Sequence, residues 1–397
     1  MNPKSMNTLA QLLNRRNFTK TTLLAGAALA SGALAAIGAD EPKKRIRVGV
    51  IGCGSVSRMY FPHLKSSPFV EIVSACDIKP ERARRQAEAF GVPNQYPNID
   101  AMLAGVPFDL LVNLTDMQEH EHLNRQAIGA GKHIWSEKPI ANSLAAGQEL
   151  LALSRQRGLR LWGAPTVVQS PQFAFMARAL AEGKLGRVAT AYASYGHRGP
   201  GWSSFFYEKG GGSMPDLGVY QLTYVTGLFG PAKSVSAMTS IITPKRDIES
   251  KGEITVNEED TAVVTLKHAD GVISHVESSF NFFSPTEHDY AGQEHHTLTV
   301  TGRKGVMHLA GYDWAPHGVD LSTDSAPEYK RYAGEKHDYV WQCGASLVAE
   351  CLATGKEPLL TPGHALHVVE IMTAARESSA TGRRIDLTST FKWPVVA

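Results

Sequence analysis

A continuous apolar run that leads directly into a glycine turn constrains this chain more than any other feature. Residues 46–51 are apolar apart from one arginine, and Gly52-Cys53-Gly54-Ser55-Val56-Ser57 follows them. Two glycines one residue apart after a buried strand are typical of the first strand-to-helix turn of a dinucleotide-binding sheet. The first glycine permits the tight turn, and the second lets backbone N–H groups approach a pyrophosphate. We expect a dinucleotide to bind at Gly52, Gly54, Ser55 and Val56.

This turn stands within a regular alternation of strand and helix signals. Further apolar strand signals follow at 70–76, 110–114 and 133–135. Helical periodicity separates them, at 55–65, 81–90, 119–130 and 144–156. Buried apolar strands that alternate with helices indicate a parallel, doubly wound sheet. We therefore predict an α/β Rossmann domain over residues 45–164.

The second half of the chain has a different pattern. Strand signals follow one another with little helix between them, at 188–195, 234–241, 261–267, 272–280, 297–301 and 305–309. Such a succession indicates an antiparallel or mixed sheet. Two helices are expected later, at 339–353 and 363–379, with Gly382 ending the last one. We predict an α+β domain over residues 165–390 with a large, mostly antiparallel, open-faced sheet.

Asp77 follows the second predicted strand, about twenty residues after the glycines, where a carboxylate accepts hydrogen bonds from the ribose hydroxyls of a dinucleotide. A carboxylate there would repel a 2′-phosphate, which favours NAD over NADP. Several cations follow closely and leave NADP open as an alternative: Lys79, Arg82, Arg84 and Arg85. A turn with a coincidental aspartate is the other alternative.

The N-terminus indicates export. Residues 1–35 contain four cations and no acidic residue, and an apolar stretch rich in Ala, Leu and Gly follows the cations. The run Asn14-Arg15-Arg16-Asn17-Phe18-Thr19-Lys20 resembles a twin-arginine signal, with cleavage expected near Ala35. We predict recognition by the twin-arginine machinery and a periplasmic or otherwise exported location. A retained membrane anchor and a fortuitous basic leader are the alternatives.

Net charge and cysteine usage exclude several classes of protein. Subtracting the four cations of the leader from the total of +2 leaves a mature charge of −2, which gives no indication of nucleic-acid binding. We found no second apolar run long enough to cross a bilayer, so the mature form is not expected to be membrane-embedded. The four cysteines form no CxxC pattern, so neither a structural zinc nor a disulfide framework is expected.

Glu137-Lys138-Pro139 follows a predicted strand at the carboxyl edge of the Rossmann sheet, the edge where ligands bind. The proline restricts Lys138 to extended backbone angles and admits a cis bond, so the ammonium group is held in a defined position. The alternative is a solvated lysine with Glu137 as its partner.

A second motif lies in the C-terminal part, where Gly210-Gly211-Gly212-Ser213-Met214-Pro215-Asp216-Leu217-Gly218-Val219-Tyr220 opens a helix. Asp216 and Tyr220 are four residues apart and share a helical face, so a carboxylate and a phenol can converge on one point. The alternatives are a capping role for Asp216, with Ser213 at the helix start, and a packed core position for Tyr220.

Together with the glycine turn, Asp77, the segment from Thr115 to His120 and Ala374-Ala375-Arg376-Glu377-Ser378, these motifs resemble the glucose-fructose oxidoreductase, inositol dehydrogenase and MocA family. The resemblance implies an NAD(P)-dependent oxidoreductase that acts on CH–OH groups and forms a homo-oligomer, a dimer or a tetramer. It implies three catalytic residues: Lys138, Asp216 and Tyr220. It adds four residues to the cofactor site: Thr115, His120, Glu137 and Lys138.

Tyr220 occupies the position where many members of this family carry an acid-base histidine, and the resemblance points to the branches that have tyrosine there. A neighbouring Lys138 ammonium would lower the pKa of the phenol, so that Tyr220 could take the alcohol proton as hydride leaves.

The substrate is expected to be a carbohydrate, bound by a polar and aromatic loop before the triple glycine. The candidate substrate residues are Gln169, His197, Arg198, Trp202 and Tyr207. An ordinary surface loop is the alternative for each. A histidine-rich segment, with His288, Asp289, His295 and His296, matches no metal-ligand spacing, so no metal is expected.

Export places the enzyme away from a replenished pool of nicotinamide cofactor. The cofactor would therefore be tightly bound and recycled in place. Two reactions fit: oxidation of one sugar or polyol with reduction of a second carbonyl compound, and redox-neutral hydrolysis of a glycoside through transient oxidation, elimination, hydration and reduction. A non-catalytic sugar-binding protein is the third alternative.

Overall fold

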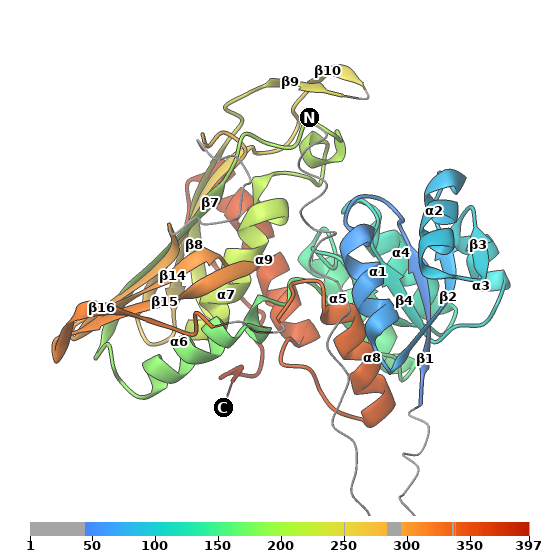
Figure 1. Cartoon of the computed structure of the whole chain (residues 1–397). Coiled ribbons are helices and arrows are strands. Elements are labelled where there is room, and N and C mark those ends of the chain that lie inside the picture. The colour runs from blue at the N-terminus through green and yellow to red at the C-terminus, as the bar shows by residue number, and fades with distance from the viewer. Residues whose placement is uncertain (1–43, 250, 284–294, 336, 338, 397) are drawn as a thin grey trace, which may run out of the picture. The chain divides into compact units, whose positions relative to one another are not determined.

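The computed structural model describes residues 44–396 except 250, 284–294, 336 and 338 (Figure 1). Lys43–Ala397 form one compact unit. The export signal expected at residues 1–35 lies outside the described residues. The two sheets predicted from the sequence are both present within this unit.

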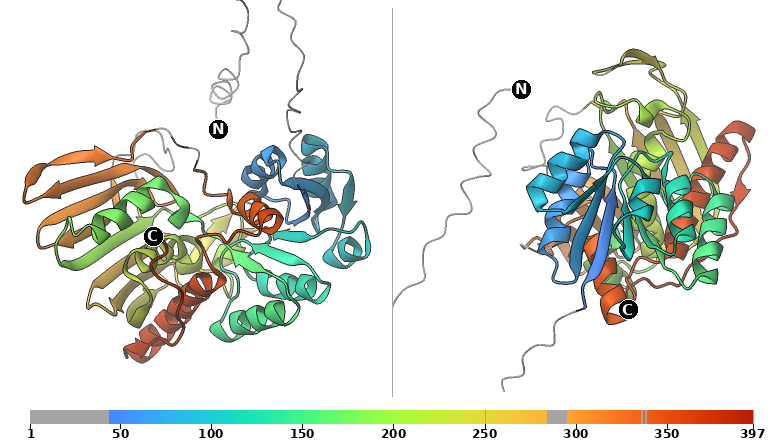
Figure 2. Two further views of the ribbon diagram at one scale, coloured as in Figure 1. Left: turned by 90° about the horizontal axis from the view of Figure 1, so that it is seen from below. Right: turned by 90° about the vertical axis from the view of Figure 1, so that its right-hand side faces the viewer.

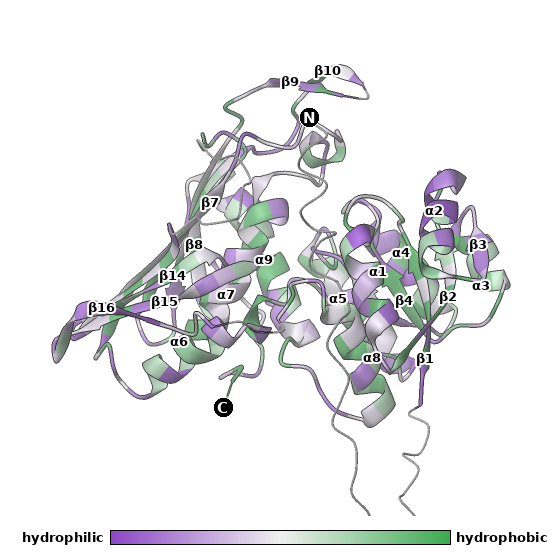
Figure 3. Ribbon diagram, viewed as in Figure 1, coloured by the Kyte–Doolittle hydropathy of each residue, from purple (hydrophilic) through white to green (hydrophobic). Residues whose placement is uncertain are grey.

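The first sheet has six parallel strands in the order β3-β2-β1-β4-β5-β6, which is the order of a dinucleotide-binding doubly wound sheet. Its strands are β1 (Ile46–Ile51), β2 (Val70–Cys76), β3 (Asn94–Tyr96), β4 (Leu110–Asn113), β5 (His133–Ser136) and β6 (Leu161–Gly163). The helices are α1 (Ser57–Ser66), α2 (Pro80–Phe90), α3 (Ile99–Ala104), α4 (His120–Gly129) and α5 (Leu144–Gln156). The central strands β1 and β4 are hydrophobic because helices cover both faces of the sheet (Figure 3).

The order of the strands gathers the predicted cofactor residues at one edge. β1 pairs with both β2 and β4, so the chain reverses direction across the sheet at β1. The loops after β1, β4 and β5 all leave from the carboxyl ends of their strands. Ligands of open α/β sheets bind in the crevice at that reversal point.

The second sheet has nine strands in the order β16-β15-β14-β13-β7-β12-β11-β8-β17. Its neighbours are antiparallel except for β7 and β12. The strands are β7 (Val188–Gly196), β8 (Ala232–Ser240), β11 (Thr261–His268), β12 (Ile273–Ser279), β13 (His296–Gly302), β14 (Gly305–Tyr312), β15 (Ala315–Thr323), β16 (Ala326–Tyr332) and β17 (Ile385–Asp386). A separate hairpin consists of β9 (Lys245–Ile248) and β10 (Gly252–Thr255).

Three helices pack on the same face of this sheet: α6 (Pro171–Ala181), α7 (Val219–Phe229) and α9 (Pro362–Thr381) (Figures 1 and 2). Every residue of α7 is buried, since the helix packs against β7 and β12 of the sheet and against both α6 and α9. Gly382 ends α9 in the left-handed conformation, with φ 67°, as the sequence predicts.

Helix α8 (Gly344–Thr354) returns to the first sheet. Its residues Ala345, Val348 and Ala349 pack in the same apolar cluster as Val48 and Trp135. The helix expected at 339–353 therefore begins five residues late. The turn before α8 is held by Thr166, whose hydroxyl donates a hydrogen bond to the carbonyl of Trp341. A helix from the C-terminal part of the chain thus packs on the first sheet.

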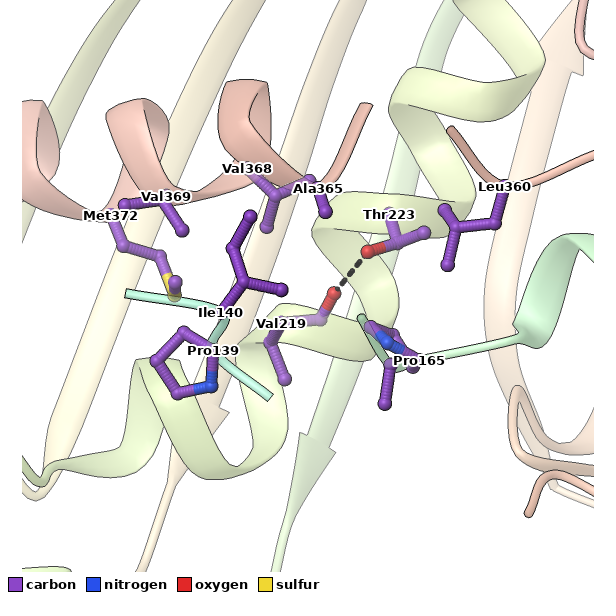
Figure 4. Close-up of a pocket in the computed structure, with 11 residues that line it drawn as sticks. Pro139, Ile140, Pro165, Val219, Thr223, Leu360, Ala365, Val368, Val369 and Met372 are labelled. Carbon is purple, nitrogen blue, oxygen red and sulfur yellow. Dashed lines mark hydrogen bonds between the residues drawn. The ribbon is translucent and has the colours of Figure 1, made fainter. Parts of the chain in front are cut away.

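An apolar seam joins the turn after β5 to α7 and α9 (Figure 4). Pro139 and Ile140 from that turn face Val219, Val368 and Met372. The Lys138–Pro139 bond is cis. These apolar contacts fix the position of the turn that carries Lys138.

Of the helices in the described part of the chain, none combines the length and the apolarity needed to cross a membrane. The four cysteines all lie among the described residues and are all free thiols.

Candidate active site

The glycine turn after β1 has the geometry that a dinucleotide requires. Gly52 has φ 88°, and a Cβ atom on it would lie 2.5 Å from the carbonyl carbon of Leu114 at the end of β4. A Cβ on Gly54 would meet only the Arg82 guanidinium, at 3.5 Å. None of the described side chains caps the start of α1. The turn therefore leaves backbone open to a phosphate at a helix N-terminus.

Asp77 lies next to this turn. Its carboxylate accepts hydrogen bonds from the backbone N–H of Cys53 and of Lys79, both at 2.8 Å. An ionised carboxylate has about four acceptor positions, so two backbone donors leave room for ribose hydroxyls. Asp77 thus also braces the glycine turn, a role that the sequence did not indicate. The residues fit an NAD molecule.

A cavity of about 310 Å³ opens above the turn. Most of the predicted cofactor residues line it: Gly54, Ser55, Val56, Thr115, His120, Glu137 and Lys138. Met59 and Asp116 also line it and were not predicted. Burial raises the pKa of the Asp116 carboxyl, and the nearby Arg82 opposes that rise.

His120 and Glu137 are tied into the protein. The two ring nitrogens of His120 lie 2.8 Å from the carbonyl of Pro139 and 3.0 Å from that of Thr115, so the ring joins the loops after β4 and β5. The Glu137 carboxylate accepts the Tyr60 hydroxyl at 2.7 Å and the Lys138 N–H at 3.0 Å. These two side chains hold Lys138 in place.

Lys138 and Asp216 form an ion pair between the turn after β5 and the start of α7. The Lys138 ammonium lies 2.8 Å from Asp216 Oδ1 and 2.7 Å from the Asp216 carbonyl oxygen. The two side chains are 10% and 13% exposed, so the pair is largely shielded from water but open to the cavity. The surface-lysine interpretation of Lys138 is wrong.

The segment before α7 is a single π-helical turn, Met214–Gly218. This turn starts after Ser213, as expected, but has no side-chain cap. The Asp216 carboxylate accepts from the Lys138 ammonium instead, so the capping interpretation of Asp216 is also wrong. Asp216 and Tyr220 line the same cavity, as their spacing predicts. π-Helical turns are frequent at functional sites.

Tyr220 is in a different electrostatic setting from the expected one. Burial, then the charges of Glu137 and Asp216, hold the pKa of its phenol well above the ordinary value. The Lys138 ammonium lies over the face of the Tyr220 ring, 5.2 Å from its centroid, and is engaged by Asp216. The expected lowering of this pKa by Lys138 is therefore wrong: the phenol is held in its protonated form.

The triple glycine supports this arrangement from behind. Gly212 has φ 110°, and a Cβ on it would lie 2.4 Å from a carboxylate oxygen of Glu259. Arg376 of α9 donates to the Gly211 carbonyl at 2.7 Å and to both Glu259 carboxylate oxygens, at 3.0 and 3.2 Å. The glycines and Arg376 thus form one structural unit that positions the start of α7.

A second cavity, of about 440 Å³, lies on the other side of Tyr220. Both cavities are lined by Trp202, Phe206, Asp216, Tyr220 and Trp341. They are therefore adjacent, and the Asp216–Tyr220 pair stands at their common boundary.

The five predicted substrate residues do not all reach these cavities. His197 and Trp202 line the second one. Tyr207 is buried, and its hydroxyl donates to the Pro200 carbonyl at 2.9 Å, so it supports the loop from inside. The guanidinium of Arg198 lies over the Phe283 ring, and Gln169 is the last residue of a short helical turn before α6. Neither lines either cavity.

Several cavity residues were missed by sequence reasoning, above all Trp314 in the β14–β15 turn and Trp341 before α8. Large indole side chains in short connections were the available signal, but only the tertiary structure brings segments so distant to Tyr220. Among the described residues no group of three or more potential metal ligands occurs. His288 and Asp289 lie outside the described residues.

A sheet built to hold a dinucleotide, opening onto a buried phenol at a second cavity, is the architecture of a nicotinamide-dependent oxidoreductase. Sequence comparison agrees. Residues 46–164 match the oxidoreductase family with an NAD-binding Rossmann fold, and residues 173–308 match the Gfo/Idh/MocA C-terminal domain. The chain belongs to the Gfo/Idh/MocA family of oxidoreductases.

Its relatives include named dehydrogenases. D-apiose dehydrogenase of Paraburkholderia graminis is 26% identical, with 87% of this chain and 91% of that relative covered. Trans-1,2-dihydrobenzene-1,2-diol dehydrogenase of Bos taurus is 25% identical, with 80% and 91% covered. The solved structure of a levoglucosan dehydrogenase with NADH and L-sorbose has the same fold, with a TM-score of 0.75, 18% identity and coverage of 87% and 99%.

Proposed function

We propose that this protein oxidises a CH–OH group of a sugar, polyol or glycoside by hydride transfer to NAD. The observation that carries the proposal is the meeting of Lys138, Asp216 and Tyr220 at the boundary between the cofactor cavity and the second cavity. The kinship with a D-apiose dehydrogenase supports a carbohydrate substrate.

The bound nicotinamide supplies a hydride acceptor. The chain supplies the rest: the Lys138–Asp216 pair offers an ammonium donor and a carboxylate acceptor for two neighbouring hydroxyls, which orients a diol. Tyr220 exchanges a proton with the reacting oxygen. Because its pKa is raised, Tyr220 is protonated at neutral pH and donates its proton when a carbonyl is reduced, and it accepts the proton of an alcohol more readily as the pH rises.

We further propose that the protein is exported by its twin-arginine leader with the cofactor already bound, and that the cofactor is recycled in place. The absence of an exchangeable cofactor pool outside the cytoplasm supports this. The closed cycle admits both the two-substrate reaction and the redox-neutral glycosidase. The presence of all three residues, Lys138, Asp216 and Tyr220, argues against a non-catalytic sugar-binding role.

We propose NAD as the physiological cofactor, because Asp77 stands where a 2′-phosphate of NADP would be repelled. We also propose the domain bounds 45–164 and 165–390, and a dimer or tetramer that uses the open face of the second sheet. Tyr192, Met238 and Ile273 are exposed on strands of that sheet, which supports such a contact.

The test is a search for retained cofactor in the purified, extensively dialysed mature protein. Absorbance and mass spectrometry should detect NAD(H), and the absorbance band of the reduced cofactor should rise when one member of a panel of sugars and glycosides is added. An empty protein would contradict the carried cofactor. A loaded protein that no sugar, polyol or glycoside reduces would contradict the proposed reaction.

A further inference from the structure

The second cavity is lined mainly by aromatic side chains. We call it the aromatic chamber, and we define it by Tyr195, His197, Trp202, Phe206, Trp314 and Trp341, with Asp216 and Tyr220 at its boundary with the cofactor cavity. Three of the six tryptophans of the chain line it. It is also larger than the cofactor-side cavity, at about 440 against 310 Å³.

The rings of the chamber form two groups that come from different parts of the chain. Trp314 and Trp341 meet edge to face, with centroids 5.8 Å apart, and Trp341 reaches Tyr220 at 6.2 Å. From the loop after β7, Trp202 packs edge to face on Phe206 at 5.0 Å. Each group presents both ring faces and ring edges, and an inserted planar ring could pack against either in the offset or edge-to-face geometries that aromatic pairs prefer.

The chamber offers little to a charged ligand. Asp216 and His197 are its titratable groups apart from tyrosines, and Asp216 is engaged by Lys138. Of the described residues that line it, none is an arginine or a lysine. A phosphate or carboxylate placed there would lose part of its hydration without gaining a cation among the described lining residues, which disfavours a charged ligand.

Trp202 stands at the junction of both cavities and is 49% exposed. An indole that lines a site while half its surface faces solvent gains free energy when a bound apolar group covers it. The chamber therefore combines a large volume, aromatic walls and an uncovered ring next to the reacting position.

We propose that the aromatic chamber binds an aromatic aglycone, so that the substrate class is an uncharged aryl glycoside whose sugar ring lies at Lys138, Asp216 and Tyr220. This inference rests on the proposed function and narrows it. Free monosaccharides would leave the chamber unfilled, and sugar phosphates, sugar acids and nucleotide sugars would place a charge in it.

The test compares matched ligands by calorimetry on the full mature protein with NADH bound, so that no turnover is needed. The ligands are methyl and phenyl glycosides of four common hexoses, together with the corresponding disaccharides and hexose 6-phosphates. For at least one hexose the phenyl glycoside should bind about tenfold tighter than the methyl glycoside, equivalent to about 1.4 kcal/mol.

Three outcomes would overturn the inference: equal affinities within every methyl and phenyl pair, a disaccharide that binds as tightly as the best phenyl glycoside, or no binding by any glycoside. The proposed function fails on a different result, a loaded cofactor that no sugar, polyol or glycoside reduces. A reduction of the cofactor by methyl and phenyl glycosides alike, with equal affinities, would retain the function and reject the aglycone site.

Variants locate the effect. Trp314→Ala should bring the phenyl-to-methyl affinity ratio close to one while the affinity for the methyl glycoside changes little. Trp314→Leu keeps an apolar side chain and serves where the alanine variant does not fold. Tyr329→Ala is the control, because Tyr329 is a 57% exposed aromatic residue on β16 that does not line the chamber. An unchanged ratio in both Trp314 variants would contradict the inference.

Discussion

The expected site and the observed site differ in the interaction partner of one ammonium group, that of Lys138. The sequence placed Lys138 near Tyr220, and the two do lie close together. The charge of Lys138, however, is taken up by the Asp216 carboxylate and carbonyl, and the phenol is surrounded by carboxylates and apolar side chains. The spacing of residues along the chain does not show whether the Lys138 ammonium pairs with Asp216 or with Tyr220.

Tyr220→Phe should lower turnover by about 10²- to 10⁴-fold, the usual contribution of a general acid-base group, and leave the bound cofactor content unchanged. Because the pKa of Tyr220 is raised, the rate of alcohol oxidation by the native protein should still be rising with pH above neutrality, whereas carbonyl reduction should not need alkaline pH. Single-turnover absorbance between pH 6 and about 10 measures both directions.

Tyr224→Phe is the matched control on the same helix, since its hydroxyl lies 3.6 Å from the Met176 sulfur and it lines neither cavity. It should turn over as the native protein does. Undiminished turnover in Tyr220→Phe would exclude the acid-base role.

Asp313 carries a second titration prediction. Burial raises the pKa of its carboxyl to about 7, and its Oδ2 atom has no hydrogen-bond partner among the described residues. A raised folded-state pKa means that this group stabilises the fold below pH about 4 and that the stabilisation is lost as the pH rises through about 7. Asp313→Asn should therefore melt at a temperature about 2–5 °C above the native protein at pH 8, with a smaller difference at pH 5.

Thermal unfolding at the two pH values measures this difference. Asp247→Asn is the control, because Asp247 is exposed on β9. An identical melting difference for Asp313→Asn at pH 5 and pH 8 would show that its carboxyl is not the titrating group.

At the scale of elements, local signals predicted the longer helices and strands that have one buried face. They missed very short strands and a strand that is exposed on both faces. The strand β2 and the helix α5 coincide with their predicted ranges, because apolar spacing and a Ser143 cap define them locally. The strands β3 and β6 have three residues each and too few positions for a period. β16 is exposed along almost its whole length and shows no alternation of burial.

Arg376 of α9 holds the triple glycine in place through the Glu259 carboxylate and the Gly211 carbonyl. Arg376→Met leaves the Glu259 carboxylate buried without its cation and should lower the free energy of unfolding by about 3 kcal/mol. The double variant Arg376→Met with Glu259→Gln should recover part of this loss, because a neutral amide does not need the cation. Urea unfolding at pH 7 measures both.

The control for this pair is Arg384→Met, since Arg384 and Asp386 form an exposed ion pair, 62% and 76% exposed. That variant should change the free energy of unfolding by less than about 1 kcal/mol. A double variant no more stable than Arg376→Met alone would mean that Glu259 is not the destabilised group.

At the scale of the whole molecule, the expected export signal lies in residues 1–43, outside the part of the chain that the structure describes. It can be tested by mutation. Replacement of Arg15 and Arg16 by lysines should retain most of the protein in the cytoplasm, since the paired arginines are the part of the signal that the export machinery reads. Cell fractionation followed by immunoblotting measures this.

Lys4→Gln removes a charge outside the arginine pair and should export normally. Export of the lysine pair at the native level would contradict the twin-arginine assignment, and would also remove the argument that the cofactor is carried within the folded protein.

The sequence by itself determined the parts of this protein that depend on neighbouring residues. The Gly52 turn, the position of Asp77, the rigid Lys138–Pro139 turn and the stop at Gly382 are all set within a few residues, by steric limits and hydrogen-bonding capacity that every chain shares. The alternation of strand and helix signals likewise identified the two sheets, because each period reflects a face that must be buried.

Only the tertiary structure decided which distant side chains meet. The Lys138–Asp216 pair joins positions 78 residues apart, and the Arg376–Glu259 pair joins positions 117 apart. Trp314 and Trp341 come from separate loops and line the same cavity as Tyr220. These contacts depend on how helices pack on two sheets, which is a property of the whole apolar core and not of any local pattern. The same packing buries Tyr220 and raises its pKa, so the chemistry of the site was decided by the fold and not by the motif that carries it.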